Sequence, residues 1–292
     1  MRRLFFLAAL FLTACRQEIS ANPPLPVVTS ALMTVTPTVT PQPTPIPATA
    51  TPITFAPPQP LSSGAVSIIT LGDDLTQGVG DDGGSGYPAR LLELVNQIRP
   101  GATMTNFGQS GWTSTDLING KDGYFGQLAR ALTEIDSSIF QGRSVVVLVW
   151  IGSNDLWTLY SGKAEISESQ ETQDLARFTA NLEAILFDLR VAGAQVVLAR
   201  LDDQSKRPAQ TRSETYPDIT AEELERMSLQ IQRYNTAISE KADFYGALTV
   251  DFFGSEFFIQ PETLSNDGYH PNAAGYDLIA QAWYKALIEI LP

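Results

Sequence analysis

The side chains best suited to chemistry in this sequence include one histidine and an aspartate three residues before it. Asp267 and His270 stand in Asp267-Gly268-Tyr269-His270-Pro271, so the carboxylate can fold back onto the imidazole across a turn. A carboxylate that accepts from one ring nitrogen fixes the tautomer, and the other nitrogen can then act as a general base. His270 is the only histidine of the chain. The pair therefore predicts an acid–base centre.

A second candidate is Asp74, in the turn Gly72-Asp73-Asp74-Leu75 that follows an apolar, β-branched run. A run of this kind, ending in a Gly-rich turn, is typical of a buried strand that delivers a side chain to the edge of a sheet. Carboxylates form covalent intermediates in several enzyme classes. Asp74 is therefore a candidate site residue at the edge of the sheet.

The elements that must position these side chains alternate between strands and helices over residues 64–292. Buried parallel strands are predicted at 66–71, 103–106, 144–151, 195–201 and 247–251. Apolar residues at helical spacing predict a long helix around 175–189 and a last helix over 278–290, while 202–220 reads as a polar loop. We expect one three-layer α/β/α domain, doubly wound and flavodoxin-like, with a mostly parallel five-stranded sheet.

Ligands of such folds bind outside the carboxyl ends of the strands, near the point where the strand order reverses. Four polar segments follow predicted strands or precede the last helix: 72–75, 106–111, 152–155 and 267–271. We therefore expect these four segments to meet at one edge of the sheet.

In this order, the four segments resemble the four motif blocks of the SGNH (GDSL-type) hydrolase family. The first is similar to G-D-S-L-T-x-G, with Asp74 at the place of the nucleophilic serine. The resemblance covers most of residues 64–292 and implies an ester hydrolase or acylhydrolase fold. It implies that Gly108, through its N–H, and Asn154, through its amide, form the oxyanion hole. It also implies that Asp267 and His270 complete the catalytic set.

Three interpretations of Asp74 stay open. In the first, serine esterase activity is lost or much reduced, because an ionised carboxylate beside His270 favours the imidazolium, and the cleft still binds a glycan or lipid. In the second, Asp74 is itself the nucleophile of a hydrolase that attacks an alkyl carbon. In the third, the aspartate marks an altered version of an ordinary serine enzyme. A purely structural surface adhesin is a further class, but it would need none of the four blocks.

Several residues near the blocks have plainer explanations. Trp150 is expected in the core, whereas Trp112 and Trp157 could line a pocket. Asp155 and Asp251 are expected to serve turns after their strands.

The N-terminus predicts export. Residues 1–15 combine Met1-Arg2-Arg3 with a short apolar run that ends in Leu12-Thr13-Ala14-Cys15, which resembles a bacterial lipobox. Cys15, the only cysteine, is the predicted lipidation site, so we expect a lipid-anchored protein of the bacterial envelope.

Residues 16–63 form a Thr- and Pro-rich stretch that predicts a disordered stalk. The formal net charge of −13 argues against nucleic acid as a partner. The expected partners are a small-molecule or polymer ester and, through the anchor, the membrane. No metal-ligand cluster or phosphate-binding loop is recognisable, so no cofactor or metal is expected.

Overall fold

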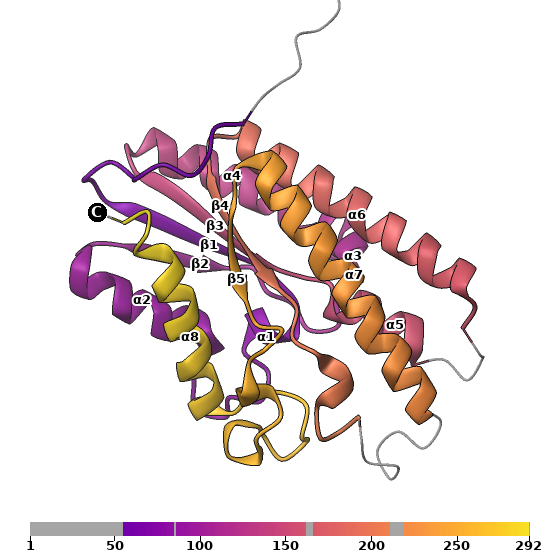
Figure 1. Cartoon of the computed structure of the whole chain (residues 1–292). Helices are drawn as coiled ribbons and strands as arrows, with labels where there is room; N and C mark the ends of the chain where they lie inside the picture. The colour runs from indigo at the N-terminus through magenta and orange to yellow at the C-terminus, as the bar shows by residue number, and fades with distance from the viewer. Residues whose placement is uncertain (1–54, 85, 162–165, 211–218, 292) are drawn as a thin grey trace, which may run out of the picture. The chain divides into compact units, whose positions relative to one another are not determined.

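The computed structural model describes residues 55–84, 86–161, 166–210 and 219–291. A single sheet of five parallel strands, β1 to β5, runs through this part of the chain (Figure 1). The strands are β1 (Val66–Gly72), β2 (Thr103–Asn106), β3 (Ser144–Trp150), β4 (Gln195–Arg200) and β5 (Leu248–Asp251). Their spatial order is β2-β1-β3-β4-β5. The predicted doubly wound, flavodoxin-like α/β fold is confirmed.

The central strands form where the sequence is richest in β-branched residues. Every residue of β1 is buried, as are six of the seven residues of β3. Strands covered on both faces carry continuous apolar runs in this way. The strand order reverses between β1 and β3, which are direct neighbours. The carboxyl ends of these two strands are therefore the expected ligand site.

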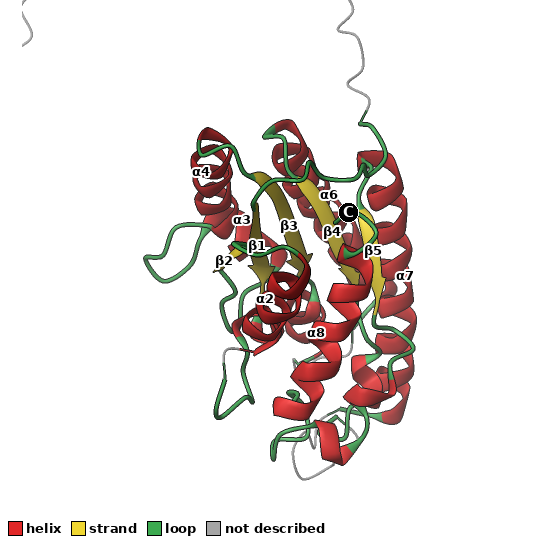
Figure 2. Cartoon of the chain, turned by 90° about the vertical axis from the view of Figure 1, so that its left-hand side faces the viewer, coloured by secondary structure: helices red, strands yellow, loops and turns green. Residues whose placement is uncertain are grey.

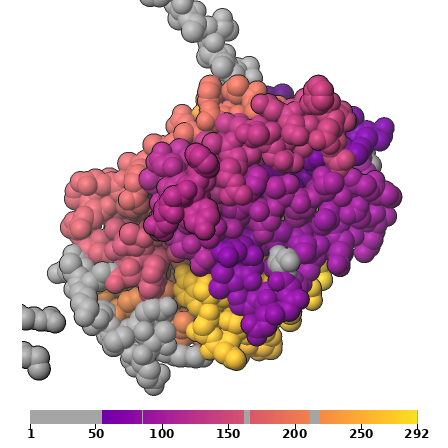
Figure 3. Space-filling model, turned by 180° about the vertical axis from the view of Figure 1, so that it is seen from behind, coloured from indigo at the N-terminus to yellow at the C-terminus, as the bar shows by residue number. Residues whose placement is uncertain are grey.

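Helices cover both faces of the sheet, giving three layers (Figures 1 and 2). On one face lie α2 (Gly86–Ile98) and α8 (Ala273–Leu287), and on the other α4 (Gln127–Phe140), α6 (Glu168–Val191) and α7 (Ala221–Tyr245). Shorter helices, α1 (Asp74–Gln77), α3 (Ser114–Asn119) and α5 (Ser153–Tyr160), start near the carboxyl ends of β1, β2 and β3. Figure 3 shows segments from the two ends of the described chain side by side on one face.

The core between the sheet and α8 is aromatic. Trp150 is fully buried and stacks on Phe252, with ring centroids 4.3 Å apart. Trp283 packs edge-on against Trp150 at 6.2 Å. The core position expected for Trp150 is therefore the one observed.

Two predicted boundaries need correction. The stalk was expected to reach residue 63, but residues 55–63 lie on the folded unit: Leu61 is buried, and its N–H donates to the Ile290 carbonyl at 2.8 Å. The Ser62 hydroxyl meets that of Ser144, the first residue of β3, at 2.9 Å. This segment thus runs along the edge where the strands begin, opposite their carboxyl ends. The proline-rich composition of this segment suggested a stalk, but two of its apolar side chains, Phe55 and Leu61, pack against the domain.

The second correction concerns residues 202–220, expected as a polar loop. Residues 202–205, 207, 209 and 210 are buried, and a short 3₁₀ turn (Gln204–Lys206) lies within them. Asp202, Ser205 and Arg207 find their polar partners inside the protein instead of in solvent. Cys15 and the rest of the predicted signal and stalk, up to residue 54, lie outside the described residues.

Candidate active site

Asp74 stands at the carboxyl end of β1, where the chain turns into α1. The preceding residue, Asp73, caps this helix by accepting from the Leu75 N–H at 3.2 Å. Gly78, with φ of 97°, ends the helix after one turn. The turn aims the Asp74 side chain at the point where the strand order reverses, and 18% of that side chain stays exposed.

Four groups from three other segments surround the Asp74 carboxylate. Its Oδ2 accepts from Asn154 Nδ2 at 2.7 Å and from the Gly111 N–H at 3.0 Å. Its Oδ1 accepts from the Ser110 hydroxyl at 2.5 Å and lies 3.7 Å from His270 Nε2. Partial burial on its own would raise the pKa of Asp74. The nearby His270 imidazole and the hydrogen bonds from Ser110, Asn154 and Gly111 outweigh it and hold that pKa well below its usual range.

His270 is held between two carboxylates. Its Nδ1 lies 2.6 Å from Asp267 Oδ2, while Nε2 faces Asp74. The other oxygen of Asp267 accepts from the N–H groups of Tyr269 at 2.7 Å and His270 at 2.9 Å, and from the Ser265 hydroxyl at 2.7 Å. Burial opposes these bonds, yet together they lower the pKa of Asp267 to about 2. Asp267 is thus an ionised acceptor that orients the imidazole.

The structure brings together Asp74, Asn154, Asp267 and His270, but it does not place the Gly108 N–H among them. That N–H donates to Asn106 Oδ1 at 2.9 Å instead. A Cβ on Gly108 would lie 2.5 Å from Gln77 N and 2.6 Å from Thr76 C, so the glycine lets this loop touch the backbone of α1. The donor role expected of Gly108 is therefore wrong, and the backbone donor at Asp74 is Gly111.

Ser110 and Gly111 are the contacts that sequence reasoning missed. Both stand inside the 106–111 block, so the signal was present. The spacing in the block did not show which N–H turns toward Asp74, because that depends on how the loop packs.

A buried group next to Asp74 behaves in the opposite way. Asp73 is fully buried, and its Oδ2 has no hydrogen-bond partner among the residues that the structure describes. Burial first, and then the like charge of Asp74, raise the pKa of Asp73 well above its ordinary value, against the bond from the Leu75 N–H. Two neighbouring carboxyl groups thus differ because one has donors and the other has almost none.

The loop that carries His270 is fastened by the buried segment after β4. Arg207 forms a two-pronged ion pair with Asp202, each contact at 2.8 Å, and both side chains are essentially unexposed. Its Nη1 also donates to the Tyr269 carbonyl at 3.0 Å. The Ala209 N–H donates to the Gly268 carbonyl at 2.9 Å. Residues 202–210 therefore help to set the position of His270.

The two tryptophans near the blocks differ in exposure. Trp112 is buried, and its carbonyl accepts weakly from Asn154 Nδ2 at 3.3 Å. Trp157 is half-buried, with its ring 6.3 Å from that of Tyr269. Of the two, Trp157 is the more exposed, and a pocket role for it stays a prediction.

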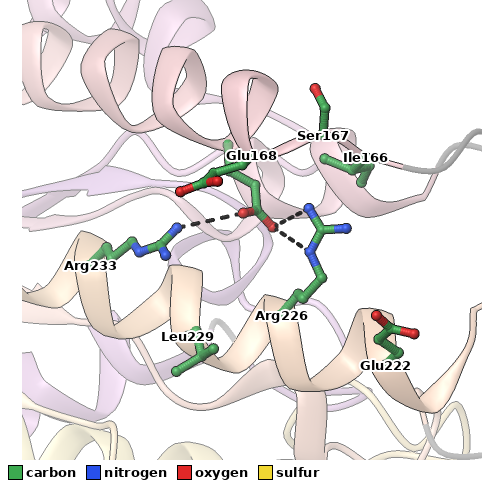
Figure 4. Close-up of a pocket in the computed structure, with 8 residues that line it drawn as sticks. Ile166, Ser167, Glu168, Glu222, Arg226, Leu229 and Arg233 are labelled. Atoms are coloured by element: carbon green, nitrogen blue, oxygen red, sulfur yellow. Dashed lines mark hydrogen bonds and ion pairs between the residues drawn. The ribbon is translucent and has the colours of Figure 1, made fainter.

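A cavity of about 440 Å³ lies away from these residues, between the N-terminal turns of α6 and α7 (Figure 4). Arg226 and Arg233 point into it and pair with the buried Glu171 at 3.0 and 3.5 Å. The arginines neutralise a buried carboxylate, so their place has a structural explanation. A second cavity of about 540 Å³ adjoins the His270 loop and is lined by Gly80, Arg90 and Asn272, among other residues.

Within the described ranges, no group of three or more His, Cys, Asp or Glu side chains is arranged to hold a metal ion. No helix in the same part of the chain is both long and apolar enough to cross a bilayer.

Comparison with known proteins identifies one family and several similar folds. A profile of the GDSL-like Lipase/Acylhydrolase family matches residues 70–278. A multidomain esterase of Ruminococcus flavefaciens is 24% identical over 257 residues, an alignment that covers 80% of this chain and 30% of that protein. The chain thus spans less than a third of the length of this relative.

Solved structures of two esterases and of a lipase/acylhydrolase share the fold. An acetylxylan esterase from Geobacillus stearothermophilus has a TM-score of 0.50 at 21% identity, covering 77% of this chain and 94% of that one. The esterase EstA from Pseudoalteromonas sp. reaches 0.51 at 19% identity, over 76% and 97% of the two chains. A lipase/acylhydrolase from Enterococcus faecalis reaches 0.50 at 19% identity, over 77% and 97%.

Proposed function

Because this chain belongs to the GDSL-like Lipase/Acylhydrolase family, we propose that its folded unit is an esterase-type domain whose serine chemistry is suppressed by Asp74. The observation that carries the proposal is the position of Asp74 Oδ2, which accepts from both Asn154 Nδ2 and the Gly111 N–H. Paired donors of this kind stabilise an oxyanion during acyl transfer. In this chain the protein's own carboxylate takes them.

Two consequences follow for ester hydrolysis. The site that a substrate carbonyl oxygen would enter is filled, and no hydroxyl stands at position 74 to attack the acyl carbon. With a serine there, His270 Nε2 would take the hydroxyl proton while Asp267 holds the ring. The acyl oxygen would then bind Asn154 and Gly111. The remaining groups thus suit acyl transfer, with position 74 as the exception.

Restoring the hydroxyl is the test. Asp74→Ser in the full chain should hydrolyse p-nitrophenyl acetate at least about a hundredfold faster than the parent, from the combined base and oxyanion contributions. Asp74→Ala is the matched control, because it frees the donors without supplying a nucleophile. A folded Asp74→Ser protein no faster than Asp74→Ala would contradict the proposal.

An aspartate-nucleophile hydrolase is the second candidate, favoured by the split environment of the carboxylate, whose two oxygens have different partners. Asp74 Oδ1 would attack an alkyl carbon of an epoxide or haloalkane, opening the ring or expelling halide, and leave a neutral ester on Asp74. His270 would then activate water to attack Cγ, with the oxyanion on Oδ2 held by Asn154 and Gly111. Against it, the Ser110 hydroxyl already binds Oδ1 at 2.5 Å.

Intact-mass measurement separates the two candidates. A His270→Gln variant incubated with styrene oxide or 1-bromohexane should gain a covalent adduct at Asp74 if the aspartate is a nucleophile. An unchanged mass under conditions that leave the protein folded leaves the suppressed esterase as the function.

We also propose that Cys15 anchors the protein to a bacterial envelope membrane and that residues 16–54 form a stalk. The lipobox-like Leu12-Thr13-Ala14-Cys15 and the Thr-Pro repeats support this. Residues 55–63 meet the domain at the edge opposite the Asp74 site, which supports an ester substrate outside the anchoring membrane. Cys15→Ser should release the protein from washed membranes, and retention would overturn the anchor.

A further inference from the structure

Asp155 lies behind the two donors and joins the segments that carry them. It follows Asn154 in the first turn of α5, and its side chain is completely buried. Its Oδ2 accepts from the Ser114 N–H at 2.7 Å and its Oδ1 from the Ser114 hydroxyl at 2.6 Å. Ser114 begins α3, three residues after Gly111. One carboxylate thus links the Asn154 segment to the Gly111 segment.

The far side of this link is also fixed. Asn181 of α6 donates to the hydroxyls of Ser114 and Thr115, each at 2.9 Å. Thr113 and Asp116 form a reciprocal cap that makes the start of α3 rigid. Movement of Ser114 away from Asp155 would therefore break buried hydrogen bonds, which costs more than breaking exposed ones.

We propose that Asp155 is a positioning residue that fixes the distance between the Asn154 amide and the Gly111 N–H by holding Ser114. The two donors come from loops after different strands, so their separation is not determined by either loop alone. Donors must be preorganised to stabilise a developing charge, and a displacement of about 1 Å can cost about a hundredfold in rate. The expected effect of Asp155 on rate rests on the proposed function, whereas its effect on the distance between the two donors does not.

The carboxylate of Asp74 is a built-in reporter of donor geometry. The hydrogen bonds that lower its pKa include those from Asn154 and Gly111. In the full chain, Asp155→Ala should let the donors drift and raise the pKa of Asp74 toward its ordinary value, measured by carboxyl ¹³C NMR titration. Loss of a nearby negative charge on its own would lower that pKa, so the sign of the shift separates positioning from simple electrostatics.

Asp174→Ala is the matched control, because Asp174 belongs to the same buried cluster through Arg177 but contacts neither Ser114 nor the donors. Ser114→Ala removes the hydroxyl contacts to Asp155 and Asn181 but keeps the N–H bond to Asp155 Oδ2, so it should give a smaller upward shift. This variant decides the test if Asp155→Ala does not fold. An Asp74 that stays ionised to the same low pH in both Asp155→Ala and Ser114→Ala would overturn the proposal. So would an equal upward shift in Asp174→Ala.

The same variants give a kinetic readout in the Asp74→Ser background. Asp155→Ala should lower kcat by about tenfold to a hundredfold with KM little changed, since the donors act on the transition state. Asp155→Asn, which keeps an acceptor facing the Ser114 N–H, should recover most of kcat. An inactive Asp74→Ser parent would defeat the proposed function but not this inference, which the NMR titration decides separately.

Discussion

The site has two sides, and they are held in different ways. On the donor side, Asn154 and Gly111 are linked through Asp155, a buried carboxylate one residue from Asn154. On the base side, the Asp267–His270 turn is held from outside by Arg207 and Ala209 of the segment after β4. The donor side is thus held by Asp155 and Ser114, which are close in sequence to Asn154 and Gly111. The base side depends on a segment about sixty residues earlier in the chain.

The two sides also differ in exposure. The Asp155 side chain is 0% exposed, whereas that of Asp267 is 47% exposed. In the proposed reaction His270, which Asp267 orients, must exchange protons, while donors work best where water is excluded. The comparison predicts that base-side changes alter rate and pH dependence, while donor-side changes alter rate alone.

The largest expected effect comes from removing the base. In the Asp74→Ser background, His270→Gln should lower kcat/KM by about 10²–10⁴, since the general base for the serine is lost. Stopped-flow assays with p-nitrophenyl acetate measure it. Asn154→Ala is the comparison, with an expected loss of about 10²–10³ and an unchanged pH profile. A change in the pH profile of Asn154→Ala would contradict the prediction that donor-side changes alter rate alone.

The next effect is on stability. Arg207→Met leaves Asp202 buried and unpaired, so the free energy of unfolding should fall by about 3–5 kcal/mol. Urea denaturation followed by circular dichroism checks this. Arg200→Met is the control, because its ion pair with Asp251 is partly exposed and should be worth no more than about 1 kcal/mol. Equal losses in both variants would show that Arg207 does not hold the base side.

A smaller effect tests the corrected donor assignment. Gly108→Ala places a Cβ against the α1 backbone and should cost about 1–3 kcal/mol of stability, read from the urea midpoint. Gly254→Ala, which meets nothing within 4 Å, should be nearly neutral. Equal midpoints in the two variants would contradict the contact between Gly108 and the α1 backbone.

The smallest effect is a pH dependence from the base side. Hydrogen bonds lower the pKa of Asp267 in the folded protein to about 2, below its value of about 3.9 in an unfolded chain. Its stabilising contribution is therefore present above pH 4 and is lost as the pH falls toward 2. Urea midpoints between pH 6 and pH 2.5 should fall less steeply in Asp267→Asn than in the parent. If the midpoints of the two proteins fall equally steeply, Asp267 does not contribute to the loss of stability at low pH.

Much of the fold was predictable from local pattern. The runs at 66–71 and 144–151 are apolar and β-branched, and burial on both faces of a parallel sheet requires this composition. The sequence pattern did not predict which polar or proline-rich segments are buried. Residues 202–210 bury Arg207 against Asp202, and residues 55–63 pack Phe55 and Leu61 on the domain. Neither has a local period, because both segments also depend on partners far along the chain, such as the Tyr269 carbonyl for Arg207 and the Ile290 carbonyl for Leu61.

By itself, the sequence determined the strand–helix alternation and the position of Asp74, Asn154 and His270 in turns after strands or before the last helix. These follow from side-chain period and turn chemistry, which act within a few residues. Only the tertiary structure decided that Gly111 and not Gly108 donates to Asp74, and that Asp155 joins the two donor segments. The direction of an N–H depends on how its loop packs, and here the contact of Gly108 with the α1 backbone sets that packing.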